Sequence, residues 1–177
     1  MTTLLEVLAF SSDRHRNQTR KDSDASPYIN HPIEVARTLV SIGSVEDINV
    51  IAAALLHDTV EDTTTTEAEL ESLFGAAISS IVAEVTDDQS LRSDERKRLQ
   101  IENTPTASHE AKLVKLGDKI ANVTDVMRAP PSHWSTARRR EYVEWAQRVI
   151  AGTRGTNGAL ESHFDTVAQQ ALSTLED

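Results

Sequence analysis

The chain has 177 residues and no cysteine, which excludes disulfides, zinc–thiolate sites, iron–sulfur clusters and a cysteine nucleophile. Its 18 basic and 28 acidic residues give a formal net charge of −10, which disfavours nucleic acid and anionic membranes as partners. No stretch approaches the ~20 apolar residues of a membrane span, and residues 1–13 lack a secretory-signal pattern, so we expect one cytoplasmic globular domain over residues 1–177.

The first two predicted helices are separated by a polar loop. A helix is expected over residues 4–20 and the loop over residues 21–27. Pro32 suits the first turn of the second helix, because its missing N–H has no partner to lose there, and Gly43 ends that helix. The stripe that we expect on its buried face is Ile33, Ala36, Leu39 and Val40.

The strongest helical periodicity of the chain lies in residues 48–56. Apolar side chains recur there at i, i+3, i+4, i+7 and i+8, which is the pattern of a helix with one buried face. Ser44 is the expected N-cap of this helix. The helix leads directly into His57 and Asp58.

The rest of the chain also has helical periodicity, and no segment alternates over the length of a strand. Thr66 and Glu69 form a predicted capping box for a short helix that Gly75 closes. Further helices are expected over residues 78–85, 94–102, 108–129, 136–150 and 157–175. We therefore predict an all-α fold, a compact multi-helix domain of roughly eight to ten helices.

His57 and Asp58 stand at the end of an apolar helix, where a buried carboxylate needs compensation by a cation or by hydrogen-bond donors. A divalent metal ion is one such compensation. Glu61 and Asp62 each follow four residues later, so the four side chains cluster across one helical turn. The alternative is a hydrated acidic helix end, which is the more common meaning of an isolated His-Asp pair.

Two further residues become candidate metal ligands when they are considered together with His57 and Asp58. His31 precedes a helix-starting proline, and taken singly it is a capping or core histidine. Asp118 interrupts the apolar stripe of the helix over residues 108–129, with Asn122 four residues on, and taken singly it is equally well a solvent-facing carboxylate. Octahedral sites for Mn²⁺ or Fe²⁺ take such nitrogen and oxygen donors, which here would be His31, His57, Asp58 and Asp118.

The order of these residues resembles the HD-domain metal-dependent phosphohydrolases. More narrowly, the chain resembles the hydrolase domain of the Rel/Spo alarmone enzymes, and most of all its small stand-alone metazoan SpoT-homologue type. The segments that carry this resemblance lie within residues 4–164 and are TRKDSDASPYINHPIEVA, ALLHDTVEDT, AKLVKLGDKIANVTDV and HWSTARRREYVEWAQRVIAGTRGTN. The resemblance implies an enzyme of the stringent response that hydrolyses guanosine tetra- or pentaphosphate to GDP or GTP and pyrophosphate.

The resemblance also implies roles for individual residues. One divalent ion, typically Mn²⁺ with Fe²⁺ as the alternative, would be held by His31, His57, Asp58 and Asp118. The residues that would orient or deprotonate the attacking water are Glu61 and Asp62. The implied substrate contacts are Arg20, Lys21, Asn122, Arg138 and Tyr142. Gly117 departs from the family pattern, which has Ala there, and a homodimer is compatible with the resemblance.

Two other functions stay open from the sequence. The first is a phosphatase that acts on another nucleotide, such as the 2′-phosphate of NADPH or a deoxynucleoside monophosphate, because fold and metal do not separate these substrates. The second is a degenerate HD fold that binds a nucleotide as a sensor without catalysis. The intact set of metal ligands and water-activating carboxylates argues against the sensor, since a binding module needs no such pair.

Overall fold

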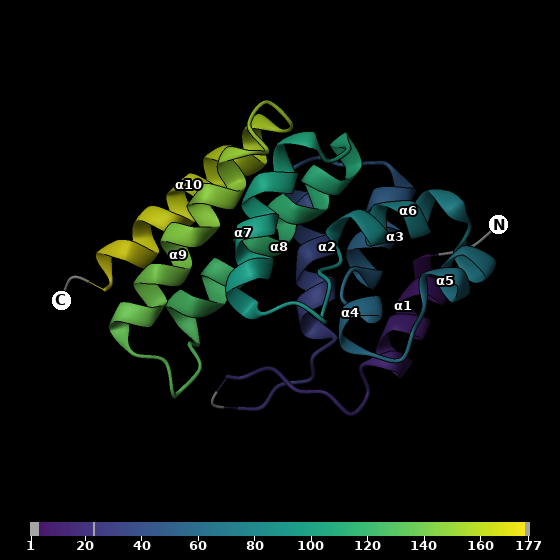
Figure 1. The fold of residues 1–177 in the computed structure, drawn as a ribbon, viewed down its shortest axis with the longest axis horizontal. Coiled ribbons are helices and arrows are strands. Elements are labelled where there is room, and N and C mark those ends of the chain that lie inside the picture. The colour runs from purple at the N-terminus through teal and green to yellow at the C-terminus, as the bar shows by residue number, and fades with distance from the viewer. Residues whose placement is uncertain (1–3, 23, 176–177) are drawn as a thin grey trace.

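The computed structural model describes residues 4–22 and 24–175, and its regular structure is helical (Figure 1). Among these residues the β contacts are limited to one isolated bridge between Thr19 and Pro27. The prediction of an all-α fold is confirmed. The helices are α1 (Leu4–Arg14), α2 (Asn30–Ser41), α3 (Ile48–Leu56), α4 (Thr59–Asp62), α5 (Glu67–Phe74), α6 (Ala76–Val85), α7 (Ser93–Asn103), the 3₁₀ helix η1 (Thr104–Thr106), α8 (His109–Arg128), α9 (Thr136–Ala151) and α10 (Gly158–Ser173).

The long helix α8 lies at the centre of the arrangement. It packs against α2, α3 and α6 on one side and against α9 and α10 on the other (Figure 1). Helix α3 is apolar along its length, and all of residues 50–56 are buried. Burial of each large apolar side chain contributes about 1.5–3 kcal/mol. The packing of α3 and α8 is therefore stable and fixes the positions of the residues at their ends. None of the described helices is both long enough and apolar enough to cross a bilayer.

Side-chain caps define several of the predicted helix starts. The Thr66 hydroxyl accepts a hydrogen bond from the Glu69 backbone N–H at 3.2 Å, which confirms that start. Caps of this type contribute about 1 kcal/mol each by satisfying a backbone donor that the helix leaves free. The same role is taken by Ser108, Ser135 and Asn157 at the starts of α8, α9 and α10.

Two predicted helix ends were wrong. Helix α1 ends at Arg14, and residues 15–17 form a turn after which the Gln18 Oε1 lies 2.7 Å from the His15 Nδ1. This segment is polar and has no apolar stripe to hold a helix against the core. At the other end of the chain, α10 ends at Ser173, so Leu175 lies outside the helix that was predicted to contain it.

The start of α3 and the buried face of α2 also differ from the predictions. The N-cap of α3 is Asp47, which accepts from the Asn49 backbone N–H at 2.8 Å, whereas Ser44 has a φ of 51° in the preceding turn. On α2, Ile33 and Val40 are 38% and 47% exposed. The buried face of α2 includes two polar residues, so apolar periodicity alone misplaced it; that face comprises His31, Pro32, Val35, Ala36, Thr38 and Leu39.

Gly117 lets α8 approach α2 closely. A Cβ atom at this position would lie 3.0 Å from Val35 Cγ1 and 3.1 Å from Leu39 Cδ2. We expect Gly117→Val to overpack this contact and to destabilise the protein by about 1–3 kcal/mol. Thermal unfolding followed by circular dichroism would then show a lower Tm, by about 2–4 °C per kcal/mol.

The matched control is Gly158→Ala, because a Cβ there meets no atom within 4 Å. Its Tm is expected to stay unchanged or to rise slightly, since alanine favours a helix over glycine. An unchanged Tm for Gly117→Val would contradict the close contact between α8 and α2.

Candidate active site

The His57-Asp58 pair connects the buried helix α3 to the short helix α4. The His57 ring lies 2.9 Å, through its Nδ1, from the carbonyl oxygen of Ala54. A carbonyl oxygen only accepts, so Nδ1 is the donor and Nε2 faces the other way. This Nε2 atom is buried and makes no aligned hydrogen bond to any residue that the structure describes. Histidines that bind metals are oriented in this manner by the second ring nitrogen.

Two more elements bring donor atoms to His57. His31 comes from the first turn of α2 and Asp118 from the middle of α8, and their Nε2 and Oδ1 atoms are 3.2 Å apart. One donor atom each from His31, His57 and Asp118 lies within 4.8 Å of the other two. Asp58 Oδ2 lies 3.1 Å from His57 Nε2 and 3.6 Å from His31 Nε2. The structure thus brings together all four of the predicted metal ligands.

The charges of this cluster suit a cation. Burial alone would lower the pKa of His57, but the carboxylates of Asp58 and Asp118 raise it well above its ordinary value. Burial would likewise raise the pKa of Asp118, and the charge of Lys119 and the two nearby histidine rings hold that pKa well below its ordinary value. A buried imidazole nitrogen beside two ionised carboxylates is a suitable nitrogen and oxygen donor set for a divalent ion.

Tyr28 connects two of the predicted site carboxylates. Its hydroxyl lies 2.7 Å from Asp58 Oδ2 and 3.0 Å from Asp62 Oδ2. Burial, followed by the charges of Asp58 and Asp62, raises the pKa of Tyr28, so the phenol keeps its proton and donates. The ring stacks on His15, with centroids 4.9 Å apart. Tyr28 was not among the predicted site residues, although it lies three residues before His31.

Glu61 is held by the segment that follows α6, while the neighbouring Asp62 is held by Tyr28. The Glu61 carboxylate accepts hydrogen bonds from the Asp87 backbone N–H at 3.0 Å and from Gln89 Nε2 at 2.6 Å. Burial raises the pKa of Glu61 to about 7, with the Asp87 hydrogen bond acting against this and neighbouring carboxylates adding to it. Burial, then the charge of Asp58, also raises the pKa of Asp62. Glu61 can therefore exchange a proton near neutral pH.

Two lysines of α8 line the same small cavity as the candidate metal ligands. The cavity measures about 180 Å³ and includes Glu61, Asp62, Lys115 and Lys119 in its wall. Lys119 Nζ donates to Asp118 Oδ2 at 2.7 Å and lies 4.9 Å from the ring centroid of Trp145. Burial, followed by repulsion from Lys119, lowers the pKa of Lys115. Neither lysine was among the predicted site residues.

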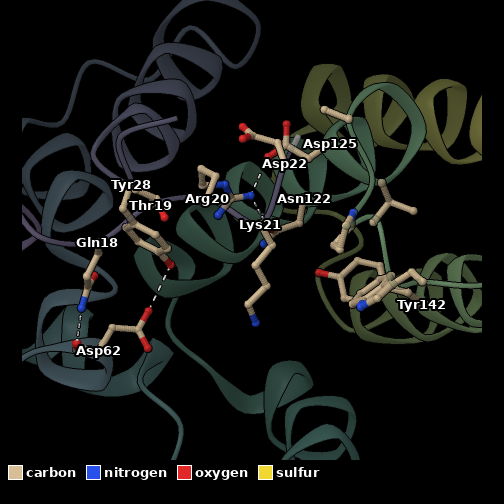
Figure 2. A pocket seen from close by; sticks show the side chains of 14 residues that line it. Gln18, Thr19, Arg20, Lys21, Asp22, Tyr28, Asp62, Asn122, Asp125 and Tyr142 are labelled. Atoms are coloured by element: carbon tan, nitrogen blue, oxygen red, sulfur yellow. Dashed lines mark hydrogen bonds and ion pairs between the residues drawn. The ribbon is translucent and has the colours of Figure 1, made fainter. Parts of the chain in front are cut away.

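A larger pocket of about 480 Å³ adjoins the small cavity (Figure 2). Arg20 Nη2 donates to Asp125 Oδ2 at 2.5 Å and to Asn122 Oδ1 at 3.3 Å. Lys21 extends into the open space with Tyr142 across from it (Figure 2). Four predicted substrate contacts therefore meet in this pocket: Arg20, Lys21, Asn122 and Tyr142. Asp125 was not predicted, although it follows Asn122 by three residues on one face of α8.

Arg138 is the predicted substrate contact that the structure does not bring to the wall of either cavity. Its guanidinium lies 4.8 Å from the ring centroid of Trp134. Trp134 does line the larger pocket, and its ring is 5.4 Å from that of Tyr142. Arg138 can therefore influence the pocket through Trp134.

The two cavities have residues in common. Tyr28, Asp62 and Asn122 line both of them. A ligand in the larger pocket therefore has a direct path to the candidate metal ligands.

Residues 8–149 match the family model described as "HD domain". A zebrafish (Danio rerio) protein named guanosine-3′,5′-bis(diphosphate) 3′-pyrophosphohydrolase MESH1 is 56% identical over 158 residues, which are 89% of this chain and 88% of that protein. The human (Homo sapiens) protein of the same name is 54% identical over 172 residues, 97% and 96% of the two chains. The solved structure described as "A metazoan ortholog of SpoT hydrolyzes ppGpp and plays a role in starvation responses" matches with a TM-score of 0.92 at 44% identity and covers 94% of both chains. The resemblance inferred from the sequence is confirmed.

Proposed function

Because this chain belongs to the HD-domain family, we propose that it is a metal-dependent hydrolase that removes the 3′-pyrophosphate of guanosine tetra- or pentaphosphate. The products are GDP or GTP and pyrophosphate. The observation that carries the proposal is the convergence of His31, His57, Asp58 and Asp118 beside a pocket of nucleotide size. The names of relatives that are 56% and 54% identical support the choice of substrate.

The four converging side chains would hold one divalent ion, and Mn²⁺ is our proposal for it. When bound, such an ion lowers the pKa of a water molecule and stabilises negative charge on phosphoryl oxygens. Two of the donors are oriented by the protein itself. Ala54 orients His57 through its carbonyl oxygen, and Lys119 orients Asp118 through an ion pair. Such supporting contacts commonly change metal affinity by about 10- to 100-fold.

In the proposed reaction, water attacks the phosphorus atom of the 3′-phosphate, the bond from that phosphorus to O3′ breaks, and O3′ takes up a proton from solvent water. Glu61 accepts the proton of the attacking water, because a base with a pKa of about 7 is matched to neutral pH. Asp62 orients the water, and Tyr28 keeps Asp62 in place by its hydrogen bond. No covalent intermediate is needed, since phosphoryl transfer depends mainly on positioning and charge stabilisation.

The larger pocket takes the nucleoside and its 5′-phosphates. Its volume of about 480 Å³ lies within the range of about 300–1,000 Å³ that is usual for small-molecule sites. Arg20 and Lys21 supply positive charge to the phosphates, and Tyr142 supplies an aromatic wall. We further propose that residues 1–177 form one domain; a homodimer and a cytoplasmic location stay predictions.

The test is a product analysis. Purified protein supplied with Mn²⁺ is expected to convert guanosine tetraphosphate to GDP and pyrophosphate, detected by anion-exchange chromatography and ³¹P NMR. Parallel reactions contain NADPH or a deoxynucleoside monophosphate. Release of inorganic phosphate from one of these, with no pyrophosphate from the guanosine nucleotide, would reject the proposed substrate. A protein that purifies without metal and stays inert with added Mn²⁺ would support the sensor instead.

A further inference from the structure

One ammonium group in the wall of the small cavity has no hydrogen-bond or ion-pair partner among the described residues. Lys115 lies on α8, three residues before Asp118, and is 7% exposed. Within residues 4–22 and 24–175 it makes no hydrogen bond or ion pair, and yet it lines the cavity beside the candidate metal ligands. Lys119, one turn later, is instead paired with Asp118. An unpaired buried cation of this kind needs an explanation, because an apolar side chain would avoid its cost.

The acidic groups whose charges act on Lys115 are already engaged elsewhere. They are Asp118 on α8, Glu61 on α4 and Asp87 in the segment that follows α6. Asp118 accepts from Lys119, and Glu61 accepts from the Asp87 backbone and from Gln89. The Asp87 carboxylate accepts from Gln100 Nε2 at 2.6 Å. The charge of Lys119 acts on Lys115 only by repulsion. The missing partner of Lys115 is therefore an anion that enters the cavity.

We propose that Lys115 binds the phosphoryl oxygens of the substrate's 3′-diphosphate and of the pyrophosphate that leaves. This inference rests on the proposed function and adds a substrate-binding residue to it. The cavity volume of about 180 Å³ is below the range of about 300–1,000 Å³ that is usual for whole small-molecule ligands, so it takes a diphosphate group and not a nucleoside. Lysine suits this role as a compact point charge for phosphate.

The two cavities then recognise the two ends of one substrate. Arg20 and Lys21 line the pocket for the nucleoside end, whereas Lys115 lines the cavity for the reacting end. Arg20 is also paired with Asp125, while Lys115 has no such ion pair among the described residues. A nucleotide without an anionic group at the reacting end should therefore gain nothing from Lys115.

The test compares Lys115→Met with the matched control Lys112→Met. Lys112 lies one turn earlier on α8, and its Nζ donates to the carbonyl oxygen of Pro105, outside both cavities. Inorganic pyrophosphate is the probe, and its affinity for the Mn²⁺-supplied protein is measured by isothermal titration calorimetry. We expect Lys115→Met to weaken pyrophosphate binding and kcat/KM for guanosine tetraphosphate by about 10- to 100-fold each. The control should change neither.

Thermal unfolding separates binding from a structural role. Metal-free Lys115→Met is expected to unfold at the same or a higher temperature than the wild type, because the substitution removes an unpaired buried charge. Lys115→Gln serves as a second uncharged variant should methionine prevent folding, and the same loss of pyrophosphate affinity is expected for it.

Two results would overturn the inference. One is wild-type pyrophosphate affinity in both folded uncharged variants. The other is a lower unfolding temperature with pyrophosphate affinity retained, which would make Lys115 a structural residue. The calorimetric measurement needs no turnover. Failure of the wild-type protein to hydrolyse guanosine tetraphosphate would therefore reject the proposed function separately, and the pyrophosphate comparison would still decide the role of Lys115.

Discussion

Asp118→Ala is expected to lower the rate of guanosine tetraphosphate hydrolysis by about 10³-fold or more and to remove most of the bound metal. The physical reason is the central position of this carboxylate, whose Oδ1 lies 3.2 Å from His31 Nε2 and 3.7 Å from His57 Nε2. Its loss leaves only three of the four proposed ligands, the two imidazoles and Asp58. Metal content by plasma mass spectrometry and single-turnover rates check the two parts of this prediction.

A matched control for this variant is Glu110→Ala. Glu110 lies in the first turn of the same helix, eight residues before Asp118, and so about 12 Å away along the axis. The Glu110→Ala variant is expected to keep the wild-type metal content and the wild-type rate of hydrolysis. If Asp118→Ala also kept both, the ligand set and with it the proposed catalytic centre would have to be abandoned.

The second large effect is expected for Glu61→Gln. Glutamine has the same size, and its carbonyl oxygen can still accept one of the two hydrogen bonds that the Asp87 backbone and Gln89 donate to the separate carboxylate oxygens, but it cannot take a proton from water. Loss of a positioned base lowers kcat by about 10²- to 10⁴-fold, while the metal content should stay at the wild-type level. Glu67→Gln, in the exposed first turn of α5, is the control and should retain full activity. A Glu61→Gln enzyme with wild-type kcat would show that another group takes the proton.

The same variant should also change how stability depends on pH. Burial raises the pKa of Glu61 from 4.5 to about 7 in the folded protein without metal. Between these two values the folded state binds more protons than the unfolded state, so wild-type stability falls as the pH rises from about 4.5 to about 7. Glutamine does not titrate, so the free energy of unfolding of Glu61→Gln should be close to that of the wild type near pH 4.5.

Above pH 7 the metal-free Glu61→Gln protein should be more stable than the wild type by about 1–2 kcal/mol, after an allowance for the partial exposure of the side chain. Urea unfolding at pH 5 and at pH 8 measures this difference. The same difference at both pH values would speak against a raised pKa for Glu61.

The all-α class was predictable because nearly every apolar pattern in the chain has helical spacing. Several helix ends were not, because they depend on contacts between elements. Ser44 is a good N-cap by residue type, but the chain turns there with a positive φ and the cap falls to Asp47. The buried face of α2 includes His31 and Thr38, two polar residues that hydrophobic periodicity assigns to the surface.

Some residues of the candidate site could be predicted from the sequence, and others depend on tertiary contacts. His57 and Asp58 could be found because they follow the most apolar helix, and Asp118 because it interrupts an apolar stripe. Lys115 and Lys119 could not, since a lysine on a helix is exposed in most proteins and only tertiary packing buries these two. Tyr28 gave no signal either, because its two carboxylate partners lie 30 and 34 residues away.

Helix α8 carries Lys115, Asp118 and Asn122 along one continuous face, with Asp125 one turn further on. In the proposed complex, one end of this face contacts the reacting phosphates and the other contacts the nucleoside, so the helix fixes the distance between the two sets of contacts. A larger residue at Gly117 would shift α8 sideways, and this shift would move both sets of contacts together. The affinity for the metal ion and the affinity for the nucleotide are therefore coupled, and a substitution that weakens one of them should also weaken the other.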